Sequence, residues 1–229
     1  MADPSPLAKV ASAADDAGLF FEDFCNWTRV PEYQQLIFES PIPQAAAQLM
    51  QSRVVRLYHD HLLVKEPRTQ QPTPWHQDQP YYNISGRQNV SFWIPVDPVP
   101  VESTLKFVSG SHSGAWYLPR TFLDEQAKWF PEGSLANVPK VDEGSEEILA
   151  WDLEPGDAVA FHMLTLHSSE GSTHRRRAFS VRLVGDDVRH APRPWVTSPE
   201  FEGLASELSA GVELDHPLFP IVYPKEPTS

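Results

Sequence analysis

The sequence predicts a mainly β domain with flanking helices, and two observations support this prediction. Short runs of aliphatic, β-branched and aromatic residues recur between Arg53 and Val184, and turn sequences such as Ser85-Gly86 and Ser109-Gly110 separate them. Proline is frequent, at 23 of 229 residues, which disfavours an all-helical protein and suits short strands joined by rigid turns. Many short strands at this spacing are typical of a sandwich or barrel rather than a parallel βαβ sheet.

The expected elements can be placed in chain order. A capped helix is expected to follow Ser40-Pro41 and to cover Pro43–Met50, since serine caps helices and proline is favoured in the first turn. A second helix is expected at Pro119–Phe130, and the proline-rich segment after Asp187 has too weak a pattern to assign. The expected strands are Val54–Tyr58, Leu62–Lys65, Pro74–Asp78, Val90–Val96, Leu105–Val108, Glu147–Leu153, Ala158–His162 and Arg176–Val184.

Size, charge and cysteine content restrict the classes of function. The 229 residues suit a single domain spanning 1–229. The formal net charge of −13 argues against a nucleic-acid partner, because phosphate binding needs basic patches. No apolar run is long enough to span a bilayer and the N-terminus does not resemble a signal peptide, so we expect a cytoplasmic protein without a membrane partner. The single cysteine, Cys25, cannot form an internal disulfide, which fits a reducing compartment.

The sequence His76-Gln77-Asp78 is a candidate metal site. Residues i and i+2 of an extended strand point to one face, so the imidazole and the carboxylate can hold one metal ion. His167 follows an apolar strand at the point where polarity returns, and it is a candidate third ligand. Two histidines and one carboxylate on one face of a metal leave the opposite positions open, which is the arrangement of non-haem Fe(II) oxygenases.

A basic cluster, Arg175-Arg176-Arg177, lies shortly after His167 and indicates an anionic ligand. An arginine can bind a carboxylate through two parallel hydrogen bonds, and a 2-oxoglutarate co-substrate needs such a partner for its distal carboxylate. Along the strand Arg176–Val184, strict alternation places Arg176, Ala178, Ser180 and Arg182 on a polar face of small residues that suits a cavity. We therefore expect Arg176 to bind the co-substrate, with Arg182 as a second cation on the same face.

The remaining histidines are weaker candidates. His162 has the opposite strand parity to His167, and His112 belongs to a turn. We expect four further histidines to be solvated: His59, His174, His190 and His216.

Two alternatives to a 2-oxoglutarate enzyme remain open on these residues. A jelly-roll metal protein of cupin type, which does not use 2-oxoglutarate, would not require an arginine on the cavity face. A non-catalytic jelly-roll binding protein, in which the His-x-Asp sequence is incidental, would bind no stoichiometric metal.

Five motifs together resemble the phytanoyl-CoA dioxygenase family, in their order and approximate spacing. They are His76-Gln77-Asp78, Ser91-Phe92-Trp93-Ile94-Pro95, Thr104-Leu105-Lys106-Phe107-Val108-Ser109-Gly110-Ser111-His112, Thr165-Leu166-His167-Ser168-Ser169 and Arg176-Arg177-Ala178-Phe179-Ser180. The resemblance covers roughly Phe20 to Asp187. One departure is Glu102-Ser103-Thr104, which stands where the family usually has an Asn-Gly turn.

The resemblance implies a double-stranded β-helix (a jelly roll, cupin-like) and a non-haem Fe(II)- and 2-oxoglutarate-dependent dioxygenase. By this resemblance His76, Asp78 and His167 are the iron ligands, and Arg176 completes the catalytic set. Three further residues fall where relatives contact the co-substrate: Ser169, Trp93 and His61.

The implied reaction consumes 2-oxoglutarate and O₂, releases succinate and CO₂, and hydroxylates or desaturates a small, fairly apolar organic substrate. Asp78 keeps a carboxylate where related halogenases lack one, so halogenation is disfavoured. Candidates for the wall of a substrate pocket are Tyr81, Tyr82, Trp116 and Trp129.

Overall fold

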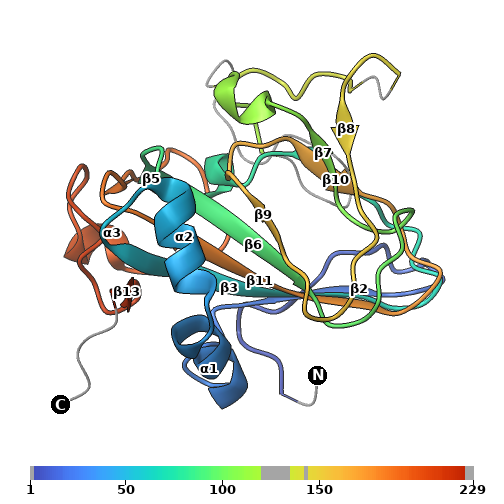
Figure 1. Cartoon of the computed structure of the whole chain (residues 1–229), viewed down its shortest axis with the longest axis horizontal. Coiled ribbons are helices and arrows are strands. Elements are labelled where there is room, and N and C mark those ends of the chain that lie inside the picture. The colour runs from blue at the N-terminus through green and yellow to red at the C-terminus, as the bar shows by residue number, and fades with distance from the viewer. Residues whose placement is uncertain (1–2, 120–134, 142–143, 225–229) are drawn as a thin grey trace.

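A sheet of seven strands forms the largest unit of the computed structural model, which describes residues 3–119, 135–141 and 144–224 (Figure 1). All of its neighbouring strands are antiparallel, and β13 (Ile221–Tyr223) pairs with β3 beside the main path. The main path runs through β1 (Lys9–Val10), β2 (Phe20–Phe24), β3 (Val55–Lys65), β11 (Arg176–Val184), β6 (Asn89–Pro95) and β9 (Val159–Phe161).

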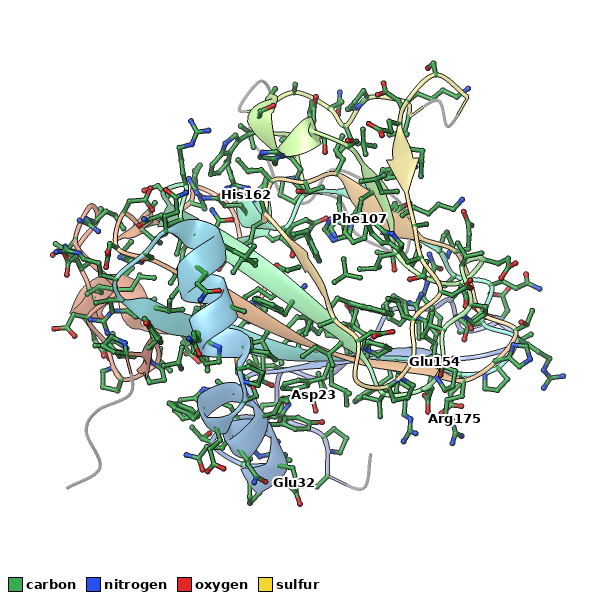
Figure 2. The ribbon with its side chains drawn as sticks, in the orientation of Figure 1. Asp23, Glu32, Phe107, Glu154, His162 and Arg175 are labelled. Carbon is green, nitrogen blue, oxygen red and sulfur yellow. The ribbon has the colours of Figure 1, made fainter. Side chains whose placement is uncertain are left out.

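A smaller antiparallel sheet faces the inner side of the large one. Its order is β4 (Thr73–His76), β10 (His167–Ser169), β7 (Lys106–Val108) and β8 (Ile148–Leu149), and a short pair joins β12 (Arg189–His190) to β5 (Ile84–Ser85). Trp93 and Ala178 of the large sheet pack in one apolar cluster with Phe107 of the small sheet, whose side chain lies in the interior (Figure 2). Two facing antiparallel sheets form the predicted jelly roll.

Two helices cover the outer face of the large sheet. These are α1 (Pro31–Glu39) and α2 (Ile42–Met50), and a third short helix, α3 (Leu204–Glu207), lies near the C-terminal end of the chain (Figure 1). Strand alternation turns Phe179, Val181 and Leu183 outward, where they pack with Ile37 of α1 and Ala46 of α2. The opposite face of the same strand is thereby left for the interior between the sheets.

Most predicted elements are confirmed, but two predicted strands are one. The helix Pro43–Met50 is confirmed as α2 and the strand Arg176–Val184 as β11, but the predicted serine cap is wrong, because Pro41 is the N-cap of α2 and no side chain caps it. The separate strands Val54–Tyr58 and Leu62–Lys65 are wrong, because β3 runs unbroken through the polar residues between them. Asp60 holds that stretch extended by accepting backbone hydrogen bonds from Asn26 and Trp27, at 3.0 and 2.9 Å.

Other boundaries shift. The strand predicted to reach Asp78 ends at His76, because Asp78 is helical (φ −70°, ψ −48°) and opens a 3₁₀ turn over Gln79–Tyr81, which contains Pro80. The strand predicted at Glu147–Leu153 is reduced to β8 (Ile148–Leu149). The elements β1, β2, α1, β5, β10 and those after Asp187 were not predicted. Apart from Pro119, the helix predicted at 119–130 lies outside the described residues, and among those described no helix has the length and apolarity needed to cross a membrane.

Candidate metal and co-substrate site

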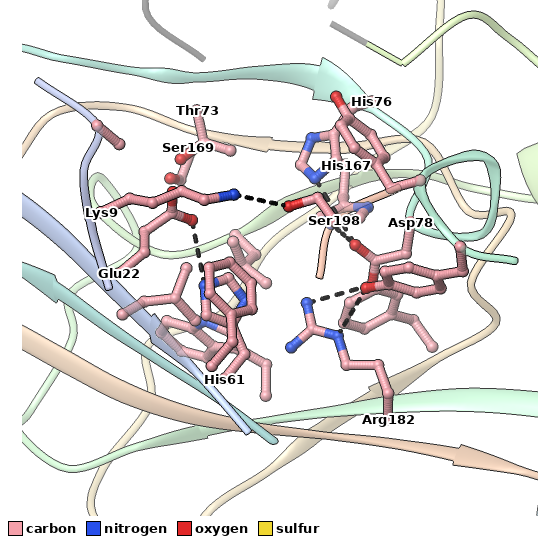
Figure 3. Close-up of a pocket in the computed structure, with 18 of the residues that line it drawn as sticks. Lys9, Glu22, His61, Thr73, His76, Asp78, His167, Ser169, Arg182 and Ser198 are labelled. Atoms are coloured by element: carbon pink, nitrogen blue, oxygen red, sulfur yellow. Dashed lines mark hydrogen bonds and ion pairs between the residues drawn. The ribbon is translucent and has the colours of Figure 1, made fainter. Parts of the chain in front are cut away.

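A cavity of about 280 Å³ lies on the inner face of the large sheet and carries the predicted site (Figure 3). Its walls combine aromatic and ionisable side chains from both sheets. The aromatic wall residues are Phe24, Tyr81, Tyr82, Trp93 and Phe161, and the ionisable ones include Glu22, His61, His76, Asp78, His167, Arg176 and Arg182. The predicted wall residues Tyr81 and Tyr82 are therefore part of the cavity, whereas Trp116 instead packs near Arg193 and Trp129 lies outside the described residues.

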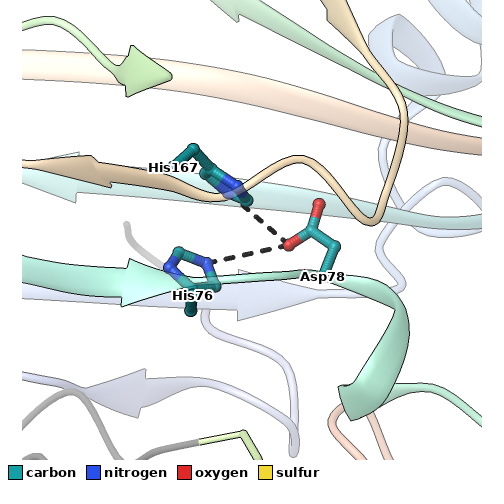
Figure 4. A group of neighbouring side chains, drawn as sticks. All are labelled: His76, Asp78 and His167. Atoms are coloured by element: carbon teal, nitrogen blue, oxygen red, sulfur yellow. Dashed lines mark ion pairs between the residues drawn. The ribbon is translucent and has the colours of Figure 1, made fainter. Parts of the chain in front are cut away.

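His76, Asp78 and His167 converge at one end of this cavity (Figure 4). All three are buried, and their ligand atoms lie within 4.8 Å of one another. Asp78 Oδ1 is 3.8 Å from Nε2 of His76 and 3.8 Å from Nε2 of His167. The pairing of β10 with β4 sets this arrangement, because it places His167 directly opposite His76. The 3₁₀ turn then directs Asp78 toward both rings, so convergence does not depend on the extended backbone that we expected there.

Hydrogen bonds to backbone carbonyls fix the orientation of both imidazoles. Nδ1 of His76 lies 2.8 Å from the Pro74 carbonyl, and Nδ1 of His167 lies 2.9 Å from the Thr165 carbonyl. A carbonyl can only accept, so each Nδ1 must carry the proton and each Nε2 presents a lone pair toward Asp78. Metal-bound histidines in proteins are commonly oriented in this way. Burial, with His167 adding to it, lowers the pKa of His76 to about 3, which keeps the ring neutral.

The second carboxylate oxygen of Asp78 is held by the protein. Ser91 Oγ donates to Oδ2 at 2.8 Å, and the buried Arg182 guanidinium lies 3.4 Å from the same oxygen. Burial alone would raise the pKa of Asp78, but the charge of Arg182, together with the Ser91 hydrogen bond, holds that pKa below its usual range. The three side chains therefore offer two neutral nitrogens and one anionic oxygen, a donor set that fits a divalent first-row metal.

Arg176 also lines this cavity. It is on the same face of β11 as Arg182, but it is the first residue of the strand whereas Arg182 lies near the end. It is 3 % exposed, and its guanidinium stands 5.7 Å from the centre of the Trp93 ring. It donates to the Ser103 carbonyl and, at 3.4 Å, to Ser169 Oγ. Within the described ranges no carboxylate pairs with it, and burial lowers its pKa to about 10. A buried guanidinium that is still protonated and has no anion beside it fits an anionic ligand.

Ser169 and Lys65 complete the polar surroundings of Arg176. Lys65 is opposite Arg176 on β3, and its ammonium nitrogen donates to the Glu170 carbonyl at 2.7 Å and to Ser169 Oγ at 3.3 Å. Ser169 Oγ thus accepts from two cationic side chains, which leaves its own proton to donate into the cavity. Burial first, and Arg176 second, lower the pKa of Lys65 well below its usual value.

Arg177 lies outside the cavity, as strand alternation predicts. Its guanidinium is exposed and forms a bidentate ion pair with Asp97, at 2.6 Å for the shortest contact. Exposed Arg175 pairs with Glu66 at 2.9 Å and lies at the molecular edge (Figure 2). Of the three consecutive arginines, the structure therefore leaves Arg176 alone in contact with the cavity.

The remaining predicted residues are three proposed co-substrate contacts and several histidines. Trp93, Ser169 and His61 all line the cavity, but His61 stands beside Glu22 at 3.1 Å. His162 lies outside the metal cluster, where its Nε2 donates to the Arg87 carbonyl at 2.9 Å (Figure 2). The expectation that His59 and His190 are solvated is wrong, since each is 1 % exposed.

Sequence reasoning missed Glu22, Lys65 and Ser91. Glu22 lies in the run Phe20–Phe24, whose apolar residues fall on both faces, so the sequence has no alternating pattern that would predict a strand there. Ser91 has a usable signal, because it has the same strand parity as Trp93 in β6.

Comparison with known proteins identifies the family. The phytanoyl-CoA dioxygenase (PhyH) family matches residues 8–178. The chain belongs to this family. A curated relative from Caenorhabditis elegans, described as a probable phytanoyl-CoA dioxygenase, is 25 % identical over 193 residues, which are 80 % of this chain and 55 % of the relative. The chain therefore spans about half the length of that relative.

Two solved structures of non-haem α-ketoglutarate-dependent enzymes resemble most of the chain. The non-haem α-ketoglutarate-dependent carbocyclase SnoK from nogalamycin biosynthesis has a TM-score of 0.71 and 25 % identity, covering 93 % of this chain and 80 % of SnoK. The epimerase SnoN, in complex with Fe³⁺, α-ketoglutarate (2-oxoglutarate) and nogalamycin RO, has a TM-score of 0.71 and 21 % identity, covering 93 % of this chain and 83 % of SnoN. The predicted family and jelly-roll fold are confirmed, and the comparisons support the predicted class, a non-haem iron and 2-oxoglutarate dioxygenase.

Proposed function

We propose that this PhyH-family protein is an Fe(II)- and 2-oxoglutarate-dependent oxygenase that hydroxylates or desaturates a small organic molecule. One observation carries the proposal: a buried His-Asp-His cluster and a buried arginine, which has no carboxylate partner among the described residues, both line one cavity. A cupin-type metal enzyme that does not use 2-oxoglutarate gives no reason for the second feature. A binding protein without metal gives no reason for the first.

Each residue has a distinct part in this proposal. His76, Asp78 and His167 hold iron, while Ser91 and Arg182 fix the orientation of Asp78. Arg176 and the Ser169 hydroxyl bind the distal carboxylate of 2-oxoglutarate, alongside the flat face of Trp93. When bound, iron and 2-oxoglutarate supply the oxidising chemistry, in which O₂ is consumed and 2-oxoglutarate leaves as succinate and CO₂.

The aromatic residues of the cavity exclude water and favour an apolar substrate. Tyr81 and Phe161 flank the two histidines, with ring centres 5.9 Å from His76 and 4.7 Å from His167. SnoK is described as acting in nogalamycin biosynthesis, and a net charge of −13 gives no support to a coenzyme A ester. We therefore favour a natural product as the substrate.

The test is an anaerobic titration with Fe(II), with and without 2-oxoglutarate. We expect a weak visible charge-transfer band only when both are present, followed on admission of O₂ by slow succinate formation. Stoichiometric metal binding without any effect of 2-oxoglutarate would support the cupin-type alternative. Absence of stoichiometric metal binding would support a non-catalytic binding protein.

A further inference from the structure

Glu22 and His61 form a second ionisable pair in the same cavity, on the side built by β2 and β3. Both side chains are 7 % exposed, and Glu22 Oε1 lies 3.1 Å from His61 Nε2. The His61 ring is stacked on Phe24, with ring centres 4.0 Å apart. Figure 3 shows the two side chains directed toward one another, apart from the group of His76, Asp78 and His167. The metal and the distal-carboxylate site described above do not involve this pair.

Among the described residues, some buried polar atoms at and behind this wall have no hydrogen-bond partner. Glu22 Oε1 and His61 Nε2 face each other without a well-directed hydrogen bond, and Ser180 Oγ, opposite His61 in the β3–β11 register, has no partner either. Buried polar atoms are nearly always satisfied, because leaving one unpaired costs about 1–3 kcal/mol. Glu22 and His61 come from the neighbouring strands β2 and β3 and both line the cavity, so their unsatisfied hydrogen-bonding atoms indicate a place that a polar ligand group completes.

The charge of the pair excludes the co-substrate from this wall. Burial acts to raise the pKa of Glu22, but the neighbouring His61 and Lys9 outweigh it and lower that pKa, so the side chain is a carboxylate. Burial lowers the pKa of His61, so its ring is neutral. A buried carboxylate repels the carboxylates of 2-oxoglutarate. We therefore expect the substrate, rather than 2-oxoglutarate, to contact His61.

A hydroxyl group matches this pair better than other polar groups. A carboxylate only accepts hydrogen bonds, whereas a neutral imidazole protonated at Nε2 can donate one. A hydroxyl can donate to Glu22 and accept from His61 at the same time. An ammonium can only donate, and a carboxylate can only accept, so each of these leaves one member of the pair unsatisfied.

The charge balance of the cavity also favours a neutral ligand. Among the buried groups that line the cavity, the carboxylates of Glu22 and Asp78 balance the guanidiniums of Arg176 and Arg182. Fe(II) and dianionic 2-oxoglutarate together add no net charge. Lys9, an exposed residue that also lines the cavity, donates to Ser198 at 3.2 Å. A charged substrate would leave an uncompensated charge in a buried site, which is costly.

We propose that Glu22 and His61 are the specificity site for a hydroxyl group of a neutral, otherwise apolar substrate. The hydroxyl bridges the two side chains, and the apolar part of the molecule lies against Phe24 and Leu63. That this alcohol is also the molecule oxidised rests on the proposed function, whereas its binding does not.

The test compares four matched bicyclic probes: indane, 2-indanol, 2-aminoindane and indane-2-carboxylate. Their dissociation constants are measured anaerobically by calorimetry on the protein loaded with Fe(II) and 2-oxoglutarate, and again on the metal-free protein. We expect wild type to bind 2-indanol most tightly. Glu22→Gln should weaken 2-indanol by roughly tenfold and leave indane unchanged, as expected for loss of a hydrogen bond to a charged group. The same variant should gain affinity for the indane carboxylate.

Two further variants serve as a control and as a second test of the pair. Glu32→Gln removes an exposed carboxylate on α1, distant from the cavity, and should change none of the four constants (Figure 2). His61→Gln should reduce the preference for 2-indanol even if Glu22→Gln fails to fold, which thermal unfolding reports. Equal binding of indane and 2-indanol by wild type overturns the proposal, as does tighter binding of 2-aminoindane, which would make the pair a cation site.

The outcome separates this proposal from the proposed function. If the Fe(II)–2-oxoglutarate band forms but wild type has no preference for the alcohol, only the hydroxyl assignment is wrong. If the band never forms and the metal-free protein still prefers 2-indanol, the oxygenase proposal is wrong and the hydroxyl site remains.

Discussion

Arg176 and Arg182 lie on the same face of β11 and both are buried, yet among the residues that the structure describes only Arg182 has a carboxylate beside it. Arg182 contacts Asp78 and also donates to the Tyr82 hydroxyl at 3.2 Å. Arg176 has a carbonyl, a serine hydroxyl and an aromatic ring around it, and no anion within the part of the chain that the structure describes. Two chemically identical side chains on one strand therefore differ in whether the described part of the protein supplies a counter-ion.

The difference separates a cation that the fold already compensates from one that a ligand must compensate. A buried ion pair that loses one partner leaves an uncompensated charge, so Arg182 belongs to the architecture of the metal site. A buried cation without a partner has already incurred the desolvation penalty, and an arriving carboxylate recovers it. Experiments that remove each group in turn can test this distinction.

The largest loss of activity is expected when a metal ligand is removed, and this loss is the reference for the two arginine variants. His167→Ala removes one of three ligands, and we expect loss of the Fe(II)–2-oxoglutarate band and of succinate formation. His174→Ala removes an exposed histidine and is the matched control. Succinate formation that survives in His167→Ala would mean that another residue is the third ligand.

Arg182→Met should reduce the stability of the metal-free protein by about 3–5 kcal/mol, because Asp78 is then buried without its counter-ion. Added Fe(II) should stabilise this variant more than it stabilises wild type, since the metal supplies the charge that Arg182 supplied. Denaturant unfolding under anaerobic conditions, with and without Fe(II), measures both effects. Equal stabilisation of the two proteins by Fe(II) would contradict the compensating role of Arg182.

Arg176→Met should have the opposite profile. We expect the ligand-free protein to keep or gain stability, since a buried unpaired cation is removed, while 2-oxoglutarate binding weakens by about 2–5 kcal/mol. Iron binding should be nearly unchanged. The measurement is the dependence of the Fe(II)–2-oxoglutarate band on 2-oxoglutarate concentration, together with the thermal shift that 2-oxoglutarate causes. If Arg177→Met shows this loss instead, the assignment of the co-substrate to Arg176 is wrong.

The strands around these arginines show which features of the site could be predicted from the sequence and which could not. The alternation of Arg176–Val184 separates the cavity face from the apolar face, because both faces of β11 have a consistent chemistry. Phe20–Phe24 has no such alternation, so the strand that carries Glu22 is hidden. The burial of His59 and Lys65 depends on segments remote in the chain, such as the one carrying Glu170. Local pattern therefore predicts which face a residue occupies but not what covers it.

The smallest effect is expected at Arg177, the exposed arginine that completes the comparison. Its ion pair with Asp97 is half in solvent, so Arg177→Met should lower the unfolding free energy by less than about 1 kcal/mol. Hydrogen bonds from Arg177 lower the pKa of Asp97 below its ordinary value of 3.8 in the folded state. A carboxylate whose pKa is depressed by folding contributes stability above its unfolded pKa and loses it as the pH falls through the folded pKa. The difference between wild type and variant should therefore be constant at neutral pH and decline below about pH 4. Urea unfolding at a series of pH values measures this difference, and a difference of several kcal/mol at pH 7 would show that exposed and buried arginines of this strand do not differ in the way proposed.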